Sequence, residues 1–396
     1  MFESLAKPPI DPILALGHAV RSDPRPARLD LGIGVYRDET GRTPIMKAVS
    51  EAERRLFDER STKTYVGARG DTVFVERIAE LVLGRSRPEE MAGIQATGGT
   101  GALRVLAGLV ARANAGAKVW LPSPTWSNHE TIFADAGLNT ATYPYYDPVE
   151  KGILVDQMMA IFKSLPPGDV VLLHGCCHNP CGVDLSRDSW RELAIVLSER
   201  GLIPLIDLAY QGFGRGLEED SQGVRELISE VPELLIAFSG SKNFGLYSER
   251  AGCALVVAEH AMAAGIAAEH MALVARPLYS MPPDHGSAIV RTILESNELS
   301  EAWRVELEQV RLSIVGKRRQ LAVALREAVG TSGFDYLEEG SGMFSLLDLS
   351  SDEVMTLRRE KGIYAVGDGR INVAGLPTDR IADFAFAIDE LVKRRR

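Results

Sequence analysis

The fold is decided by residues 169–210, "DVVLLHGCCHNPCGVDLSRDSWRELAIVLSERGLIPLIDLAY". Two apolar runs, "DVVLLHGCC" and "LIPLIDLAY", flank the stretch "SRDSWRELAIVLSERG", where apolar residues recur at spacings of three and four. Short runs that are apolar throughout are typical of strands buried on both faces. Apolar residues at spacings of three and four, as in the stretch between the two runs, are typical of a helix. The stretch therefore predicts a strand–helix–strand unit with parallel strands.

The same alternation extends over residues 90–260. We expect further strands at "GIQATGG", "AKVWLP", "ELLIAFS" and "GCALVVA", with a helix at "TGALRVLAGLVARANA". An α/β sheet of this kind, covered by helices on both faces, binds ligands at the carboxyl ends of its strands. After residue 300 we expect a long helix, roughly from Glu301 to Val329, and then strands in "GMFSLLDLS" and "IYAVGDGRINVAG". These predict a smaller α+β unit, which the segment before residue 45 is expected to join.

Composition excludes several classes of protein. The chain has 396 residues, of which 45% are hydrophobic, and a net charge of −10 with no basic stripe, so nucleic acid is not expected as a partner. No apolar run approaches the roughly 18 residues of a membrane span. Four cysteines in so long a chain do not form a disulfide framework. We expect a cytoplasmic protein without a membrane partner.

Lys242 stands in an unusual place, in "FSGSKNFG" at the end of the apolar run "ELLIAFS". An ordinary surface lysine would lay its stem over apolar surface and keep its ammonium in water. The alternative is a desolvated amine that forms Schiff bases. The stretch alone leaves both interpretations open.

Polar residues follow several of the other strands. In "TGGTGAL", Gly99 and Thr100 stand where a helix begins, which predicts either an anion site or a plain glycine turn. In "LIDLAYQGFG", Asp207 lies near the end of an apolar strand, where a buried carboxylate needs a partner, and Tyr210 lies at the same edge. Arg250, in "SKNFGLYSERAG", suits phosphate but is equally common in surface ion pairs.

Three further stretches offer contacts for a ring or a carboxylate. Trp126, in "PTWSNH", predicts core packing or a flat platform for a ring. Asn179, in "HGCCHNPCG", follows a strand. Arg370, in "GDGRINVAG", stands in an apolar setting that a carboxylate ligand would satisfy. The cysteines of "HGCCHNPCG" are residue types that bind metals. Adjacent Cys176 and Cys177 are, however, expected to point to opposite faces of a strand, so no metal is predicted.

One ligand accounts for these signals together. A phosphate group needs "GGTG", Ser239 and Arg250, and an aromatic ring needs Trp126. A protonated ring nitrogen needs Asp207, a ring hydroxyl needs Tyr210 and Asn179, and an aldehyde needs Lys242. The ligand with these groups is pyridoxal 5'-phosphate, whose protein partners are a Schiff-base lysine and an acid at the pyridinium nitrogen.

The sequence also resembles the aspartate and aromatic amino acid aminotransferases, class I pyridoxal-phosphate enzymes of fold type I, almost from end to end. The resemblance includes the stretches "DPILAL", "LGIGVYRDETGRTP", "KTYVG", "GGTGALR", "HGCCHNPCG", "IDLAYQGFGRGLEED", "SKNFGLYSERAG", "YSMPPDHG", "GMFS" and "GRINVAG". It implies a large cofactor-binding domain at 45–309 with a mostly parallel seven-stranded sheet. It also implies a small domain at 12–44 and 310–396, an N-terminal arm at 1–11, and a homodimer with shared active sites.

The resemblance also implies roles for single residues. Lys242, Asp207 and Tyr210 match catalytic residues. The implied cofactor contacts are Tyr65 from the neighbouring subunit, Gly99, Thr100, Trp126, Asn179, Asp207, Tyr210, Ser239, Lys242 and Arg250, with His129 behind Asp207. The implied substrate contacts are Gly34, Trp126, Asn179, Arg370 for the α-carboxylate, and Arg276 from the partner for the side chain of a dicarboxylate.

Departures near Arg276 bear on the substrate. Leu278 and Met281 stand where aspartate-preferring members carry asparagines, so we expect a more hydrophobic pocket and activity with aromatic amino acids as well as aspartate. Pro277 is expected to hold Arg276 in an extended conformation. The expected reaction moves an amino group between an L-amino acid and 2-oxoglutarate in a ping-pong cycle.

Four alternatives stay open at this point. A strict aspartate aminotransferase would share every motif, and a decarboxylase or lyase would use the same scaffold to break another bond. A cofactor-binding sensor is disfavoured because both carboxylate-binding arginines are present. A nicotinamide dehydrogenase is disfavoured because the glycine spacing and the acidic residue of its fingerprint are missing.

Overall fold

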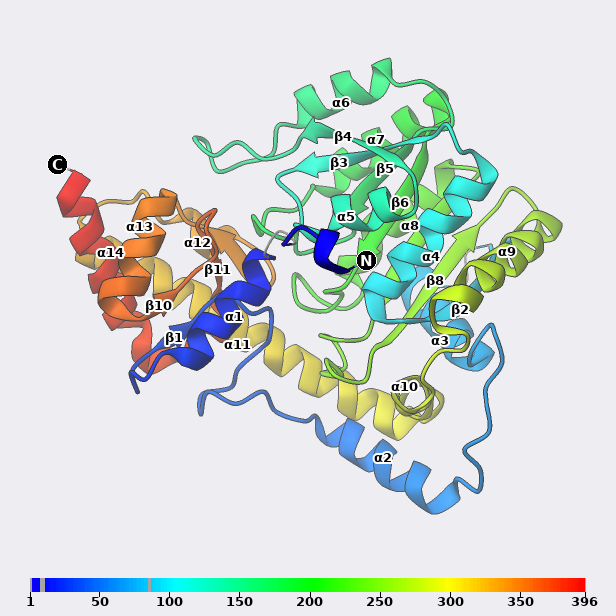
Figure 1. The fold of residues 1–396 in the computed structure, drawn as a ribbon, viewed down its shortest axis with the longest axis horizontal. Helices are drawn as coiled ribbons and strands as arrows, with labels where there is room; N and C mark the ends of the chain where they lie inside the picture. The colour runs from blue at the N-terminus through cyan, green and yellow to red at the C-terminus, as the bar shows by residue number, and fades with distance from the viewer. Residues whose placement is uncertain (1, 8–10, 85–86, 396) are drawn as a thin grey trace. The chain divides into compact units, whose positions relative to one another are not determined.

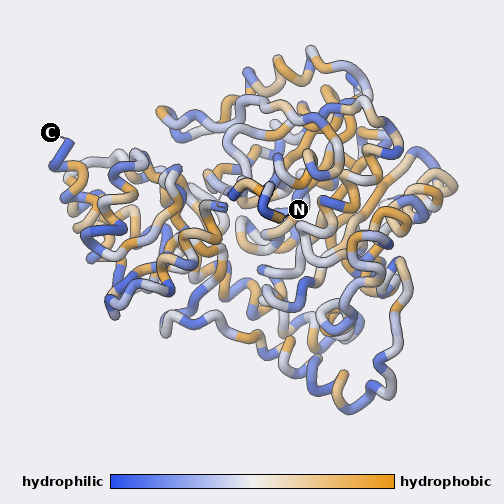
Figure 2. The backbone as a smooth tube through the Cα atoms, viewed as in Figure 1, coloured by the Kyte–Doolittle hydropathy of each residue, from blue (hydrophilic) through white to orange (hydrophobic). Residues whose placement is uncertain are grey.

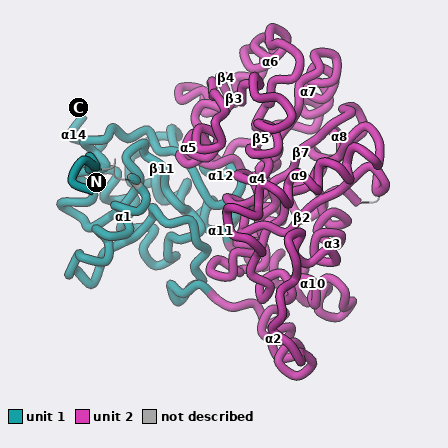
Figure 3. Tube along the Cα trace, turned by 45° about the vertical axis from the view of Figure 1, so that its right-hand side comes forward, with its two compact units in different colours: residues 1–43, 314–396 teal, residues 44–313 magenta. Residues whose placement is uncertain are grey.

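The computed structural model describes residues 2–7, 11–84 and 87–395. The chain divides into two compact units (Figure 3): Met1–Thr43 with Ile314–Arg396, and Pro44–Ser313. We call them the small unit and the large unit. Part of the predicted N-terminal arm, residues 1 and 8–10, lies outside the described residues.

The large unit contains a seven-stranded sheet in the order β2-β8-β7-β6-β5-β3-β4 (Figure 1). Neighbouring strands are parallel except at β8, which is antiparallel to both β2 and β7. The prediction of a mostly parallel α/β sheet is therefore confirmed. The strands are β2 (Met91–Thr97), β3 (Lys118–Ser123), β4 (Asn139–Pro144), β5 (Val170–His174), β6 (Ile203–Leu208), β7 (Leu234–Ser239) and β8 (Ala251–Val257).

The residue pattern alone predicted six of these strands and missed β4. Its sequence, "NTATYP", has one buried residue, Tyr143, because β4 lies at the edge of the sheet and pairs only with β3. Strand recognition that depends on continuous apolar runs fails for such an edge.

Helices cover both faces of the sheet. On one face, alternate strand residues such as Val119, Leu121, Val170 and Leu172 pack in one core with the helices α4, α5 and α9. The strands accordingly lie as apolar segments inside the large unit (Figure 2). The helices of this unit are α2 (Lys47–Glu59), α3 (Thr72–Leu83), α4 (Gly98–Ala113), α5 (Asn128–Asp135), α6 (Val155–Ser164), α7 (Arg187–Arg200), α8 (Gln222–Glu230), α9 (Ala261–Tyr279) and α10 (His285–Glu295).

The small unit has its own core and mixed α+β structure, as predicted. Strands β1 (Leu29–Asp30) and β10 (Ile363–Tyr364) pair in parallel, and β9 (Phe344–Leu346) and β11 (Arg370–Asn372) pair antiparallel. The predicted long helix is α11 (Asn297–Val329); it begins four residues before Glu301 and contains the boundary between the units. The remaining helices are α1 (Pro12–Ser22), α12 (Tyr336–Glu339), α13 (Ser351–Thr356) and α14 (Ile381–Arg395). None of the described helices has the length and apolar character needed to cross a membrane.

Candidate active site

Most of the predicted residues of the large unit gather along one edge of its sheet. Parallel strands end at the same edge, and β8 begins there because it runs the other way. The segments that follow β2, β3, β5, β6 and β7, and the one that precedes β8, therefore meet at this edge. In this order they carry Gly99 and Thr100, Trp126, Asn179, Tyr210 with Asp207 at the end of its strand, Lys242, and Arg250.

A buried chain of polar side chains supports Asp207. Its Oδ2 lies 3.1 Å from Nε2 of His129, and both side chains are almost fully buried. Nδ1 of His129 lies 2.7 Å from the hydroxyl of Thr125, which in turn lies 3.2 Å from Nε2 of His174. Burial alone would raise the pKa of Asp207, but the hydrogen bond with His129 and electrostatic interactions with His129, His174 and Lys242 hold it below its ordinary value. The carboxylate is thus ionised at neutral pH, so Nε2 of His129 donates to it.

Lys242 lies beside these groups. Its side chain is half-buried, and Nζ lies 4.8 Å from the centroid of the Tyr210 ring. Its positive charge is one of those that lower the pKa of Asp207. An exposed lysine with its ammonium in open solvent would neither lie against the Tyr210 ring nor lower the pKa of Asp207. The geometry therefore favours an amine directed toward the sheet edge.

A cradle of small and cationic groups lies at the start of α4. A Cβ on Gly99 would lie 3.0 Å from Cβ of Ser239, and one on Gly98 would lie 2.6 Å from Nη2 of Arg250. Gly98 also has a φ of +70°, which side chains rarely adopt. Nη1 of Arg250 donates to the hydroxyl of Ser241 at 3.0 Å. The glycines therefore bring the helix start, its backbone N–H groups and a guanidinium together.

The small unit contains two of the predicted substrate contacts, Arg370 and Gly34. Arg370 is 4% exposed, its Nη2 donates to the carbonyl of Gly32 at 3.0 Å, and its guanidinium lies 4.6 Å from the centroid of the Phe344 ring. A Cβ on Gly34 would lie 3.0 Å from Cζ of the same ring. Nδ2 of Asn372 donates to the carbonyls of Ile33 and Val35, both at 2.7 Å, and so holds the Gly34 loop. Arg370 and Gly34 thus flank one aromatic ring.

Tyr65 and Arg276 lie outside the sheet edge. Tyr65 is 84% exposed, and Arg276 is exposed in the last turn of α9, where its Nη1 donates to the hydroxyl of Ser280 at 2.8 Å. The prediction that Pro277 makes Arg276 extended is wrong, because both residues continue α9. A proline near the end of a helix costs a single backbone hydrogen bond, which the last turn tolerates.

Sequence reasoning missed four polar residues. Thr125 and His174 complete the Asp207 chain, Ser241 anchors Arg250, and Asn372 holds the Gly34 loop. The signals were present, since each stands within or beside a quoted motif. Each hydrogen bond, however, joins residues that only the fold brings together or whose side-chain direction depends on a turn.

Comparison with known proteins gives a consistent result over nearly the whole chain. The sequence model of the family described as "Aminotransferase class I and II" matches residues 27–388. A tyrosine aminotransferase of Rhizobium meliloti is 49% identical to this chain over 97% of this chain and 98% of its own length. An aspartate aminotransferase of Salmonella typhi is 42% identical over 98% of this chain and 99% of its own.

Solved structures agree with the sequence comparison. The aromatic-amino-acid aminotransferase of Burkholderia pseudomallei, solved covalently bound to pyridoxal phosphate, superposes with a TM-score of 0.95 at 37% identity. The superposition covers 99% of each chain. Both units and the whole sheet edge therefore lie within the matched length.

Proposed function

This chain belongs to the family of class I and II aminotransferases, and we propose that it moves the amino group between 2-oxoglutarate and both aromatic and dicarboxylic L-amino acids. It is a pyridoxal-phosphate-dependent amino acid aminotransferase. The observation that carries the proposal is the constellation at the sheet edge, where the Lys242 amine and the buried Asp207–His129 pair lie with the glycine cradle at the start of α4.

The residues present fit the cofactor. The cradle of Gly98, Gly99, Ser239 and Arg250 excludes side-chain bulk and offers N–H donors, a hydroxyl and a cation, which is the donor set that a phosphate monoester needs. The ionised Asp207 suits a protonated ring nitrogen. When bound, pyridoxal phosphate supplies an aldehyde that an amine can attack and a ring that withdraws electrons from the bonds of the substrate's α carbon.

Lys242 is the general base in the proposed mechanism. Its Nζ, once neutral, takes the proton from the substrate's α carbon and later releases it. The centroid of the Tyr210 ring lies 4.8 Å from Nζ, on one side of the amine. Tyr210 and Asn179, both buried, are proposed to hold the ring hydroxyl, and Trp126 to cover the ring face.

Asp207 maintains the charge that the reaction needs. Because its pKa is lowered in a buried setting, the carboxylate holds a proton on the ring nitrogen by attraction rather than taking that proton itself. His129 fixes the orientation of the carboxylate through the 3.1 Å contact at Oδ2.

Arg370 is proposed to bind the α-carboxylate of every substrate. Its guanidinium is buried and fixed by Gly32 and the Phe344 ring, so it is preorganised for a bidentate pair. Gly34, held by Asn372, is proposed to offer its backbone to the substrate.

Arg276 is proposed to set the choice of substrate. Within the described ranges, the partner of its guanidinium is the hydroxyl of Ser280, near Leu278 and Met281, which supply apolar surface. A hydroxyl holds a guanidinium less firmly than charged partners do, so Arg276 can pair with a dicarboxylate or leave room for a ring. The relatives named above include both a tyrosine and an aspartate aminotransferase.

The test is a steady-state assay of the purified holoenzyme with 2-oxoglutarate and a panel of amino acids. We expect turnover with aspartate, phenylalanine and tyrosine, and oxaloacetate as the product from aspartate. Turnover of aspartate alone would refute the role given to Leu278 and Met281, and release of alanine and carbon dioxide would identify a decarboxylase. Borohydride reduction followed by peptide mapping is expected to label Lys242, and no label is expected in Lys242→Ala.

We also propose a homodimer with shared sites, supported by the exposure of Tyr65 and Arg276. The test mixes two variants that are expected to lack activity with aspartate, Lys242→Ala and Arg276→Ala, after dissociation and reassociation. If Arg276 serves the partner's site, hybrids contain one intact site and regain activity with aspartate. If both residues act in one chain, mixing restores nothing. The cytoplasmic location stays a prediction.

A further inference from the structure

A second group of reactive side chains lies near β5, outside the residues assigned to the cofactor. Sγ of Cys176, Sγ of Cys177 and a carboxylate oxygen of Asp220 all lie within 4.8 Å of one another, and all three residues are buried. Asp220 is in the short 3-10 helix η3 (Glu219–Ser221). No other such group of three His, Cys, Asp or Glu ligands occurs in the described part of the chain.

The expectation that the two cysteines point to opposite faces is wrong. Side chains alternate only while the backbone is extended, and β5 already ends at His174. Cys177 has a φ of +52°, which turns the chain in the left-handed sense. The carboxylate of Asp184 holds this turn by accepting from the backbone N–H of Cys177 at 2.7 Å and of His178 at 2.9 Å. The turn places both thiols on one side.

The carboxylate of Asp220 is also fixed. Oδ2 accepts from the backbone N–H of Gly212 at 2.8 Å and of Gly214 at 2.9 Å, and Oδ1 accepts from that of Arg215 at 2.8 Å. A Cβ on Gly214 would lie 2.6 Å from Oδ1 of Asp220 and 3.1 Å from Sγ of Cys177. The glycine therefore allows the carboxylate and the thiol to meet.

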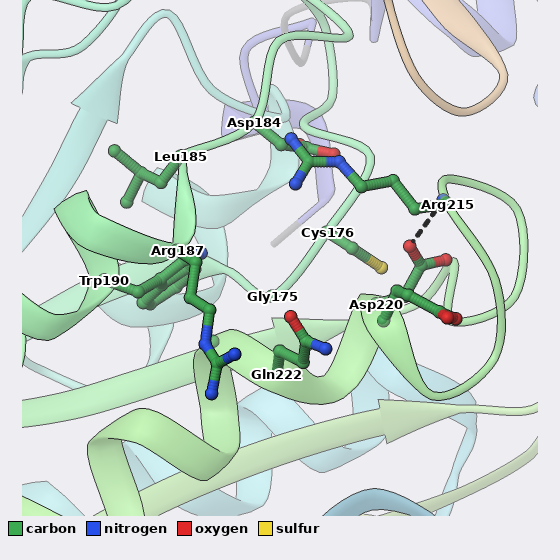
Figure 4. A pocket seen from close by; sticks show the side chains of 11 residues that line it. Gly175, Cys176, Asp184, Leu185, Arg187, Trp190, Arg215, Asp220 and Gln222 are labelled. Atoms are coloured by element: carbon green, nitrogen blue, oxygen red, sulfur yellow. Dashed lines mark hydrogen bonds between the residues drawn. The ribbon is translucent and has the colours of Figure 1, made fainter.

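A small cavity borders this group. Its volume is about 30 Å³, enough for one water molecule, and Cys176 and Asp220 line it together with Asp184, Trp190 and Gln222. Sγ of Cys176 points toward the Asp220 carboxylate (Figure 4). The cavity leaves room for a ligand atom that the protein does not supply. Two cationic side chains, Arg187 and Arg215, also line it.

We propose that Cys176, Cys177 and Asp220 bind one thiophilic divalent cation, such as Zn²⁺ or Cd²⁺, with a water molecule in the cavity as the fourth ligand. Zn–S bonds of about 2.3 Å in a tetrahedron place the ligand atoms about 3.8 Å apart, so shifts of about 1 Å close the site. Binding breaks two S–H bonds, releases two protons to solvent and forms two S–metal bonds without oxidation or reduction. Thiolate ligands select soft cations over Mg²⁺ and Ca²⁺.

The metal-bound site would carry a small net negative charge, with cationic side chains nearby. Two thiolates and one carboxylate carry three negative charges, and the cation leaves one, which Arg187 and Arg215 at the cavity wall partly offset. The site shares no residue with those proposed to hold the cofactor, and Sγ of Cys177 lies 3.9 Å from the carbonyl of one of them, Tyr210.

The test titrates Cd²⁺ into reduced, metal-free holoenzyme. We expect one bound Cd²⁺ per chain and an ultraviolet thiolate-to-cadmium charge-transfer band. Cys176→Ser and Cys177→Ser are each expected to weaken binding at least tenfold, because each removes a thiolate ligand. The matched control is Cys253→Ser, since Cys253 is a buried cysteine of β8 outside the group; its Cd²⁺ affinity is expected to equal that of the wild type.

Three results of the titration would overturn the proposal. These are no stoichiometric Cd²⁺ binding by the wild type, unchanged affinity in folded Cys176→Ser and Cys177→Ser, or equal loss in Cys253→Ser. Cofactor absorbance and thermal unfolding report whether each variant is folded. X-ray absorption on the wild type needs no variant: two sulfur and two oxygen ligands per Cd²⁺ are expected, and a shell of oxygen alone refutes the site.

Discussion

His129→Leu is the perturbation that most directly tests how the fold controls Asp207. Leucine has roughly the volume of histidine but lacks Nε2, the donor that lies 3.1 Å from Oδ2 of Asp207. Both partners are buried, so water does not replace the lost hydrogen bond. The carboxylate then loses orientation and becomes easier to protonate, because burial raises its pKa when the hydrogen bond with His129 no longer opposes it.

The size of the effect follows from the nature of the contact. A hydrogen bond to a charged group contributes about 1.5–3 kcal/mol. At about 1.4 kcal/mol for each factor of ten, the proton-abstraction step is expected to slow by roughly 10- to 150-fold. Lys242 and the phosphate cradle are untouched, so cofactor binding is expected to survive.

The assay is a stopped-flow single turnover of the holoenzyme with saturating aspartate, followed by cofactor absorbance. Thr125→Val is the matched control, since it removes the 2.7 Å contact on Nδ1 and leaves the Asp207 contact intact. We expect it to slow the step less than tenfold. A His129→Leu rate within threefold of wild type, or an equal loss in both variants, would refute the reasoning.

Three further predictions concern single residues. Arg250→Met is expected to weaken cofactor affinity about 10- to 150-fold in an equilibrium titration, because a charged hydrogen bond to phosphate is lost. The control is Arg304→Met, since Arg304 is half-buried and pairs with Glu218 outside the cradle, and equal affinities of both variants would contradict the cradle. Arg370→Leu is expected to raise KM for all amino acids at least tenfold, whereas Arg276→Leu is expected to affect aspartate and not phenylalanine; identical substrate profiles would contradict these assignments. Burial lowers the pKa of His174 to about 3 from 6.5, so the unfolded chain binds a proton that the folded chain does not, and stability falls as pH drops below 6.5. Urea unfolding should show that wild type loses ~2 kcal/mol more than His174→Gln between pH 7 and pH 5, and parallel pH profiles would count against this.

The Asp207 group shows how far prediction of the site extends from sequence. An acidic residue at the end of an apolar run was enough to predict a buried carboxylate at a ligand-binding edge, because a continuous apolar run indicates a strand buried on both faces, and such sheets bind ligands at the carboxyl ends of their strands. Its link to His129 rested on the resemblance, and the further links to Thr125 and His174 came only from the structure. Those contacts join the segment after β3 to residues at the ends of β5 and β6, and the pattern does not specify the order of these strands in the sheet.

The cysteine pair shows the opposite case. Alternation of side chains is a rule for extended backbone, and the sequence "HGCCHNPCG" does not reveal that the strand ends before the first cysteine. The left-handed turn at Cys177 depends on the Asp184 carboxylate, and Asp220 reaches the thiols from a separate segment. Contacts between separate segments therefore decide that both thiols lie on the same side, against the expectation of opposite faces.

The sequence by itself determined the α/β class, six of the seven strands of the large sheet and the residue types available near their ends, because burial on both sheet faces produces continuous apolar runs that can be recognised locally. Only the tertiary structure decided which side chains meet across strands, such as Arg250 with Gly98, and where a turn overrides alternation, as at Cys177. The physical reason is that hydrogen bonds and steric contacts between segments act over a few ångströms, whereas the residues that make them stand tens or hundreds of positions apart.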